Sequence, residues 1–439
     1  MPEFLYGRMM GVASLVLKNV TLPDGRVVDL SLRSGEVVHA GSGLAADQSI
    51  DCTGKLVLPA ATDIHVHMRG GPQSLKEDWK TGSMSALAGG TTLVVDQPNT
   101  APPLATPEAF SRRVEEAHLH SCCHFAINSA VTRQTPFRLM EQEGAMAFGE
   151  TFFGASSYGD TIRPETLRHA LTEIVRFSGL VTVHAETVRT GKDGDLLRHG
   201  EARSVAGEVE AVHAVERLNR VACRLHFCHL SSARAVDAVR ASSFEVTPHH
   251  LLLSTEMFRN SADPKGKVNP PLRPDHERRD LMRLWDRIPI IASDHAPHTL
   301  AEKQGLFCDA PSGIPGVETM MPLLVKRVLD HTISPGSLIE KTSANPALLL
   351  GIKKAGFSTG DRADFAIFPK SAIRIHADDL HSRSGWTPYE GMPAVFPSKV
   401  IMNGMTVFDE GVFFPGNPLW FYGKGYRPPL SVSVTRRPK

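Results

Sequence analysis

Short apolar runs that end in a histidine, aspartate or glutamate recur along the middle of this 439-residue chain. Between them lie stretches with the spacing of amphipathic helices, such as 161–177, 204–220 and 275–286. Regular alternation of buried strands with helices is typical of a parallel sheet covered by helices, and its length here fits a closed (β/α)8 barrel. The apolar runs are TTLVVD (91–96), GLVTVHAE (179–186), RLHFCHLS (224–231), SFEVTPHH (243–250) and PIIASDH (289–295).

The two ends of the chain have a different character, because both residues 13–57 and 361–415 read as short strands separated by turn signals. Charge excludes some partners: 48 Lys and Arg balance 47 Asp and Glu, so we expect neither nucleic acid nor a membrane surface. The start of the chain lacks an apolar run of signal length, so we expect no signal peptide. Six cysteines without a CxxC pair indicate a reducing compartment, the cytoplasm.

The polar ends of the apolar runs supply the residue types of a metal site. His65 and His67 lie two apart in DIHVHMR, so on a strand they share one face. The carboxyl ends of barrel strands meet at one face of the fold, so we expect the polar residues there to lie close together. Any one of these polar residues could instead cap the end of its strand. That explanation becomes weaker as the same pattern recurs at several strand ends. The set of four histidines and one aspartate is enough for two metal ions: His65, His67, His184, His229 and Asp294.

Glu150 is a lone carboxylate in AFGETFFG, a run otherwise typical of a buried strand. Burying a charge without a partner is costly. Two neighbouring metal ions need a bridging anion, so we expect the Glu150 carboxylate to bridge them. The alternatives are that it caps a loop or pairs with an arginine.

Nine motifs then place the chain beside a known family. In order along residues 13–415 they are DIHVHMR, DQPNTAPP, VHAE, CHLSS, VTPHHLLL, KVNPPLR, SDHAPHT, APSGIPGVET and SANPALLLG. Together they resemble the dihydroorotase branch of the amidohydrolase superfamily. The resemblance implies a barrel with a small β-sandwich domain built from both chain ends. The implied regions are 10–57 plus 355–425 for the sandwich, 58–354 for the barrel, and 426–439 for a C-terminal tail.

The resemblance also implies an activity, the reversible cyclisation of N-carbamoyl-L-aspartate to L-dihydroorotate in pyrimidine biosynthesis. His65, His67 and Asp294 would hold one zinc ion, and His184 and His229 a second. Asp294 would act as general acid and base beside a hydroxide that bridges the metals. Relatives of this kind further suggest a homodimer. The implied contacts to this small-molecule substrate are Arg69, Asn99, Asn269, His298, Pro315 and Gly316.

The family pattern breaks at Glu150, where relatives commonly carry a carboxylated lysine. No lysine occurs between Lys80 and Lys192, so the sequence excludes that group on this strand. Glutamate offers the same carboxylate, but its side chain reaches roughly 3–4 Å less far. Either the strand lies further inward, or Glu150 holds only one metal, or the metal pair is looser.

Arg69 separates the candidate functions. A cation beside metal ions is unfavourable unless it receives an anion, and a guanidinium binds a carboxylate in bidentate fashion. Glu77 or Asp78 is the alternative partner. The substrates of an allantoinase or a dihydropyrimidinase (hydantoinase) lack the ring carboxylate, so Arg69 and Asn99 would have no task there. A non-catalytic homologue would usually have lost metal ligands, whereas this chain departs from the pattern only at Glu150.

Three further features carry weaker expectations. We do not assign His249 or His250 as metal ligands, and expect one of them to orient a ligand from behind. Cys228 is expected to face away from His229, into the core. Segment 298–311 is predicted to be a loop and a candidate lid over the site.

Overall fold

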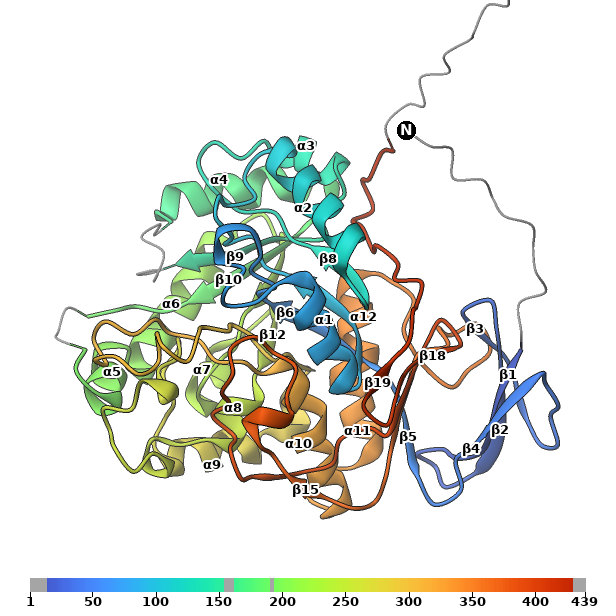
Figure 1. The fold of residues 1–439 in the computed structure, drawn as a ribbon. Coiled ribbons are helices and arrows are strands. Elements are labelled where there is room, and N and C mark those ends of the chain that lie inside the picture. Colours follow the sequence, from blue (N-terminus) through green and yellow to red (C-terminus); the bar gives the residue numbers. More distant parts are fainter. Residues whose placement is uncertain (1–13, 154–161, 190–192, 429–439) are drawn as a thin grey trace, which may run out of the picture.

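The computed structural model describes residues 14–153, 162–189 and 193–428. Within these ranges, eight consecutive strands run in parallel around a common axis, with helices outside them (Figure 1). They are β6 (Ala61–Val66), β7 (Thr91–Asp96), β8 (His124–Ile127), β9 (Phe148–Phe153), β10 (Leu180–Ala185), β11 (Arg224–Phe227), β12 (Ser243–Val246) and β13 (Ile290–Ile291).

The eight strands close into a barrel. The orders β6-β7-β8 and β13-β12-β11-β10-β9 account for two open sheets. Parallel bridges join the sheets at both edges, between Ser129 and Phe148 and between Val66 and His295. No edge is left open among these strands, and the predicted (β/α)8 barrel is confirmed. The carboxyl ends of all eight strands therefore meet at one face.

Several helices begin at a capping side chain. The carboxylate of Asp78 accepts the Thr81 amide at the start of α1, and the Ser204 hydroxyl accepts the Gly207 amide at the start of α6. In the described ranges, no helix is both long and apolar enough to cross a membrane. The helices are α1 (Trp79–Ala88), α2 (Pro107–His120), α3 (Phe137–Gln142), α4 (Pro164–Ile174), α5 (Leu196–Ala202), α6 (Val205–Leu218), α7 (Ala233–Ala238), α8 (Pro248–Leu252), α9 (Asp275–Arg283), α10 (Val317–Leu329), α11 (Pro335–Ile339) and α12 (Asn345–Leu350).

Both chain ends build a second, smaller β unit, seen beside the barrel in Figure 1. One sheet has the order β3-β2-β1-β4 and the other the order β19-β18-β17-β14-β5. Buried residues of both sheets, such as Leu17, Leu30, Phe365 and Ile401, share one apolar core, as expected of a sandwich. The strands are β1 (Leu15–Thr21), β2 (Val27–Arg33), β3 (Glu36–Gly41), β4 (Gln48–Asp51), β5 (Leu56–Pro59), β14 (Phe365–Phe368), β17 (Lys399–Met402), β18 (Met405–Asp409) and β19 (Val412–Phe413), with β15 (Ile373–Arg374) and β16 (Pro393–Ala394) in a separate pair.

The pairing of β5 with β14 ties the two chain ends together. The boundaries 10–57 plus 355–425 and 58–354 stay a prediction. Residues 10–13, and 429–439 of the predicted tail, lie outside the described residues.

Two strand predictions extended too far. The run SFEVTPHH is strand only to Val246, because the Thr247 hydroxyl caps α8, which carries His249 and His250. The run PIIASDH is strand only over Ile290–Ile291, so Asp294 lies beyond the strand end.

Strand β9 lies unusually close to β10. At Gly149, where φ is +123°, an added Cβ would fall 2.1 Å from the carbonyl oxygen of Thr182. Only glycine tolerates both this backbone conformation and this approach. The register of the pair shifts between Val181 and Val183, next to the same point. Glycine at position 149 therefore allows the strand that carries Glu150 to approach its neighbour.

Replacing Gly149 with alanine is expected to lower the free energy of unfolding by about 3 kcal/mol or more, because the new Cβ overlaps Thr182. The matched control is Gly360→Ala: φ is +89° there, but nothing lies within 4 Å of the added Cβ. The Gly360→Ala control should lower the free energy of unfolding by only about 1–2 kcal/mol, the cost of placing an alanine at positive φ. Urea unfolding of both variants gives the comparison, and equal losses would refute the close approach.

Candidate metal centre and active site

Six predicted ligand side chains converge at the carboxyl face of the barrel. His65, Glu150 and His184 belong to β6, β9 and β10, whereas the other three lie one to three residues past the ends of β6, β11 and β13. The structure brings all six together, and each is at most 8% exposed: His65, His67, Glu150, His184, His229 and Asp294.

The Glu150 carboxylate lies between two histidine pairs. Its Oε1 is 2.8 Å from His229 Nε2 and 3.1 Å from His184 Nδ1. Its Oε2 is 3.6 Å from His65 Nε2 and 4.0 Å from His67 Nε2. Each oxygen thus faces one pair, the arrangement that a carboxylate shared by two cations requires.

Asp294 completes the first of these donor sets. Its Oδ1 lies 3.3 Å from His67 Nε2 and 3.5 Å from His65 Nε2. The buried Nε2 of His65 has no hydrogen-bond partner, although leaving such an atom unpaired is costly. Imidazole nitrogens and carboxylate oxygens are the donors that zinc prefers in catalytic sites. The side chains present therefore form groups that could hold a metal ion, one with His65, His67 and Glu150 and another with Glu150, His184 and His229.

The charges of the cluster follow from its mutual contacts. Burial alone would raise the pKa of Glu150, but the imidazoles around it, His65 foremost, hold that pKa well below its ordinary value. The pKa of Asp294 is lowered in the same way against the effect of burial. Burial also lowers the pKa of His184, yet Glu150 and Glu186 outweigh it and raise the pKa to about 9. Both carboxylates are therefore ionised, and cation binding displaces a proton from His184.

Two buried carboxylates orient the histidines from behind. His65 Nδ1 is 2.5 Å from Glu245 Oε1, and His184 Nε2 is 2.8 Å from Glu186 Oε2. These contacts direct His65 Nε2 and His184 Nδ1 at Glu150. The sequence analysis missed both carboxylates, although each lies within an apolar run that it had singled out.

Two further side chains at the cluster differ from expectation. The amide oxygen of Gln97, which follows β7, accepts the Glu150 backbone N–H at 2.9 Å and so fixes the start of the bridging residue. Gln97 was not singled out. Cys228 was expected to face away from the ligands, which is wrong: its Sγ lies within 4.8 Å of ligand atoms of His65 and Glu245. Strand alternation fails there because β11 ends at Phe227.

His250 is engaged by groups outside the ligand cluster, whereas both ring nitrogens of His249 are buried without a hydrogen-bond partner. His250 contacts the Thr247 hydroxyl at 2.8 Å and the Pro270 carbonyl at 3.0 Å. The ring of His249 is fully buried against His250, and burial lowers its pKa to about 3. The role of either ring behind a ligand stays a prediction.

A small cavity is lined by five of the six side chains of the cluster. Arg69, Asn99 and Asn269 line it, as predicted for substrate contacts. Both side-chain polar atoms of Asn99 are buried without a hydrogen-bond partner, so its amide is available to a ligand. The lining also contains residues that the sequence analysis did not name: Phe152, Ala296, Ser312 and Gly313.

Three other predicted contacts lie behind the cavity wall. His298 Nε2 is 3.4 Å from Arg69 Nη2 and 3.0 Å from the Ser312 carbonyl oxygen. Gly316 donates its N–H to His295 Nδ1 at 3.1 Å, and neither it nor Pro315 is part of the lining. The SGIPG segment thus presents Ser312 and Gly313 to the cavity instead.

The alternative partners proposed for Arg69 are engaged elsewhere. Asp78 forms an ion pair with Arg383 at 2.7 Å, and Glu77 accepts a hydrogen bond of 2.5 Å from Ser382. The Arg69 Nε donates to the Pro297 carbonyl oxygen at 3.3 Å. The hydrogen bond to Pro297 helps to hold the Arg69 guanidinium in the cavity wall.

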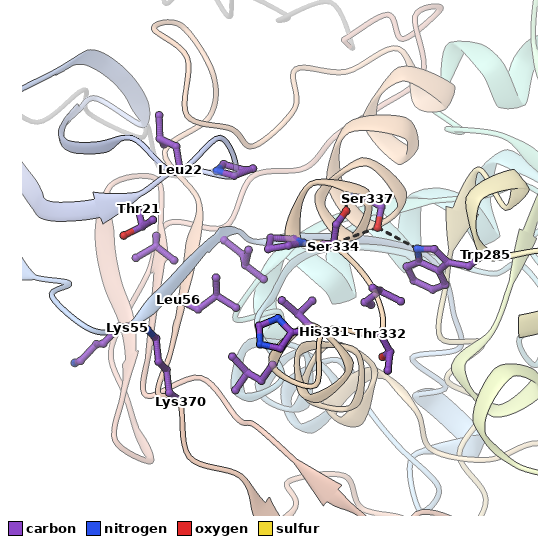
Figure 2. Close-up of a pocket in the computed structure, with 18 of the residues that line it drawn as sticks. Thr21, Leu22, Lys55, Leu56, Trp285, His331, Thr332, Ser334, Ser337 and Lys370 are labelled. Carbon is purple, nitrogen blue, oxygen red and sulfur yellow. Dashed lines mark hydrogen bonds between the residues drawn. The ribbon is translucent and has the colours of Figure 1, made fainter. Parts of the chain in front are cut away.

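A larger cavity, of about 930 Å³, lies between the sandwich and the outer helices of the barrel (Figure 2). His331, Lys55 and Lys370 gather on one side of it, and Trp285 lies on the other. Among its described lining residues, His331 is the one histidine and Asp286 the one carboxylate. It therefore lacks the donor sets of the smaller cavity, which remains the candidate active site.

Comparison with known proteins agrees with this geometry. A dihydroorotase of Methanosarcina acetivorans is 38% identical over 436 residues, which cover 92% of this chain and 93% of that protein. A dihydroorotase of Archaeoglobus fulgidus is 39% identical over 400 residues, 86% of this chain and 95% of that protein. An L-hydantoinase (dihydropyrimidinase) from Arthrobacter aurescens has the same fold, with a TM-score of 0.84, 25% identity, and coverage of 91% of this chain and 97% of that one.

The model of the amidohydrolase family matches residues 56–407, a range that contains every side chain of the ligand cluster. The chain belongs to the amidohydrolase family.

Proposed function

We propose that the protein is a dihydroorotase, which catalyses the reversible cyclisation of N-carbamoyl-L-aspartate to L-dihydroorotate in pyrimidine biosynthesis. The observation that carries the proposal is a single cavity lined by Arg69 and Asn99 together with five of the six candidate metal ligands. The relatives named dihydroorotase, at up to 39% identity, support it.

Two zinc ions per chain are part of this proposal. His65, His67, Asp294 and Glu150 would hold one, and His184, His229 and Glu150 the other. When bound, the cations supply a water of lowered pKa and polarise the ring amide carbonyl. We also propose a cytoplasmic homodimer, which light scattering on the purified protein would test.

Asp294 is the proposed proton carrier. It lines the cavity beside the histidines and is ionised there, so it starts the ring-opening reaction as a base. It accepts a proton from the attacking water and passes that proton to the ring nitrogen as the C–N bond breaks. In ring closure the same carboxyl group takes the proton from the carbamoyl nitrogen.

Arg69 and Asn99 are the proposed specificity residues. The guanidinium offers paired N–H donors to the substrate carboxylate, and the amide of Asn99 adds another donor. A cation held in the wall beside the donor sets favours a substrate that brings an anion. Neutral cyclic amides lack that anion.

The decisive experiment compares substrates on the purified, zinc-loaded protein. We expect turnover of dihydroorotate, with little turnover of allantoin or dihydrouracil, and loss of activity after chelation that zinc restores. Preferential turnover of a neutral ring would assign the chain to the hydantoinase type instead. No turnover of any of them by protein with full metal content would favour a non-catalytic homologue.

Removing the Glu150 carboxylate is expected to disrupt both donor sets at once. The variant Glu150→Gln keeps the side-chain shape but loses the anion, so zinc retained after dialysis should fall from about two ions per chain to about one or fewer. Glu141→Gln is the control, because Glu141 is also buried but pairs with Arg138 on α3. Atomic absorption gives the zinc content, and an unchanged value in Glu150→Gln would refute the shared ligand.

Replacing Arg69 with methionine should lower kcat/KM for dihydroorotate by about 100-fold or more, because the substrate carboxylate loses its bidentate partner. Zinc content should not change. Arg69→Lys keeps the positive charge but lacks the planar guanidinium, so its kcat/KM should lie between those of the wild type and Arg69→Met. Steady-state kinetics of the three proteins give the comparison. A kcat/KM of Arg69→Met equal to that of the wild type would contradict the role of Arg69 as the partner of the substrate carboxylate.

A further inference from the structure

Lys303 is a buried lysine that the proposed mechanism does not use. It lies in segment 298–311 and is 1% exposed. Its ammonium donates to three backbone carbonyl oxygens, those of Pro264 at 3.0 Å, Lys267 at 3.2 Å and Pro311 at 2.7 Å. It also lies 5.4 Å from the centre of the Trp386 ring. Three donors thus meet three acceptors, the full capacity of an ammonium group.

The three acceptors lie next to residues that line the active-site cavity. Lys267 is two residues before Asn269, and Pro311 directly precedes Ser312 and Gly313. The Lys267 carbonyl oxygen also accepts the Gly313 N–H at 3.0 Å. The Ser312 hydroxyl donates to the Asn269 side-chain oxygen at 3.2 Å. Both lining segments therefore converge on one ammonium group.

The same lysine fixes the segment that follows the metal ligand Asp294. Trp386, which lies against Lys303, donates its indole N–H to the His298 carbonyl oxygen at 2.8 Å. His298 in turn contacts Arg69. Removing the ammonium would leave three buried carbonyl oxygens without a donor, so the segments would separate or admit water.

We propose that Lys303 is a positioning residue, whose ammonium holds Asn269 and the Ser312–Gly313 segment as a preformed wall against the substrate. The role goes beyond the donor sets, because neither Lys303 nor its acceptors contact them in the described structure. It rests on the proposed function for the identity of the substrate, but not for the order of the wall. Segment 298–311 then acts as an anchored brace rather than as a lid.

The test replaces Lys303 with methionine, which is apolar and of similar length. We expect KM for dihydroorotate to rise about tenfold while kcat changes less than about threefold, since binding is lost and the reacting groups stay in place. Zinc content should match the wild type. Backbone amides of residues 308–316 should exchange with deuterium faster than in the wild type.

Lys341→Met is the matched control. Lys341, which follows α11, is 4% exposed, donates to the Ile288 carbonyl oxygen at 2.6 Å and lies 5.3 Å from the Trp285 ring centre. None of these three residues lines the active-site cavity. The KM of this variant and its exchange over 308–316 should equal those of the wild type. The same KM rise in Lys341→Met would overturn the proposal, because loss of any buried lysine would then suffice.

A conservative variant keeps the proposal testable if Lys303→Met does not fold. Lys303→Arg keeps the charge but not the compact three-donor geometry, so it should recover part of the lost affinity and part of the protection. Unchanged KM and unchanged exchange in Lys303→Met, or in Lys303→Arg if the former does not fold, would overturn the proposal. If the wild type fails to turn over dihydroorotate, the proposed function fails, and the exchange data alone judge Lys303.

Discussion

The contact on which the active site depends is the Glu150 carboxylate between two pairs of imidazoles. Four histidines face it from three different strands, within distances of 2.8 to 4.0 Å. A buried carboxylate is tolerable only where such partners neutralise it, and the imidazoles need an anion as much as it needs them. The positions of the four histidines and the ionised state of Glu150 therefore depend on each other, and both require the strands that carry them to lie side by side in the closed barrel.

Placing a glutamate carboxylate between the histidines requires a particular backbone position of β9. Glutamate reaches less far than a carboxylated lysine by roughly 3–4 Å, so the carboxylate has to be delivered partly by the strand. Gly149 permits this, since no side chain separates β9 from Thr182 on β10. The side chain of Gln97, just past the end of β7, accepts the Glu150 backbone N–H. The chain thus combines a short side chain with a strand that packs closely against its neighbour.

Periodicity predicted the parts of the fold that repeat, and failed where strands end. The run TTLVVD became β7 over the predicted residues, and all six of them are buried, as expected of a strand in a parallel barrel. The direction of Cys228 was wrong because β11 ends at Phe227, which interrupts the alternation on which that prediction relied. Glu186 and Glu245 could have been found, since a carboxylate within an apolar run near a histidine needs a partner. Lys303 could not, because its acceptors are backbone carbonyls that no sequence pattern marks.

The cavity wall and the ligand cluster follow different physical rules. The cluster is held by opposite charges in direct contact, so its geometry is strongly coupled to protonation and to bound cations. The wall at Asn269, Ser312 and Gly313 is held by backbone carbonyls around one buried ammonium and contains no carboxylate of its own. Such a wall presents donors to an anionic substrate without placing a competing anion beside the cations. Backbone carbonyls are neutral acceptors, so they hold the Lys303 ammonium without adding an anion that would compete with a substrate carboxylate for Arg69.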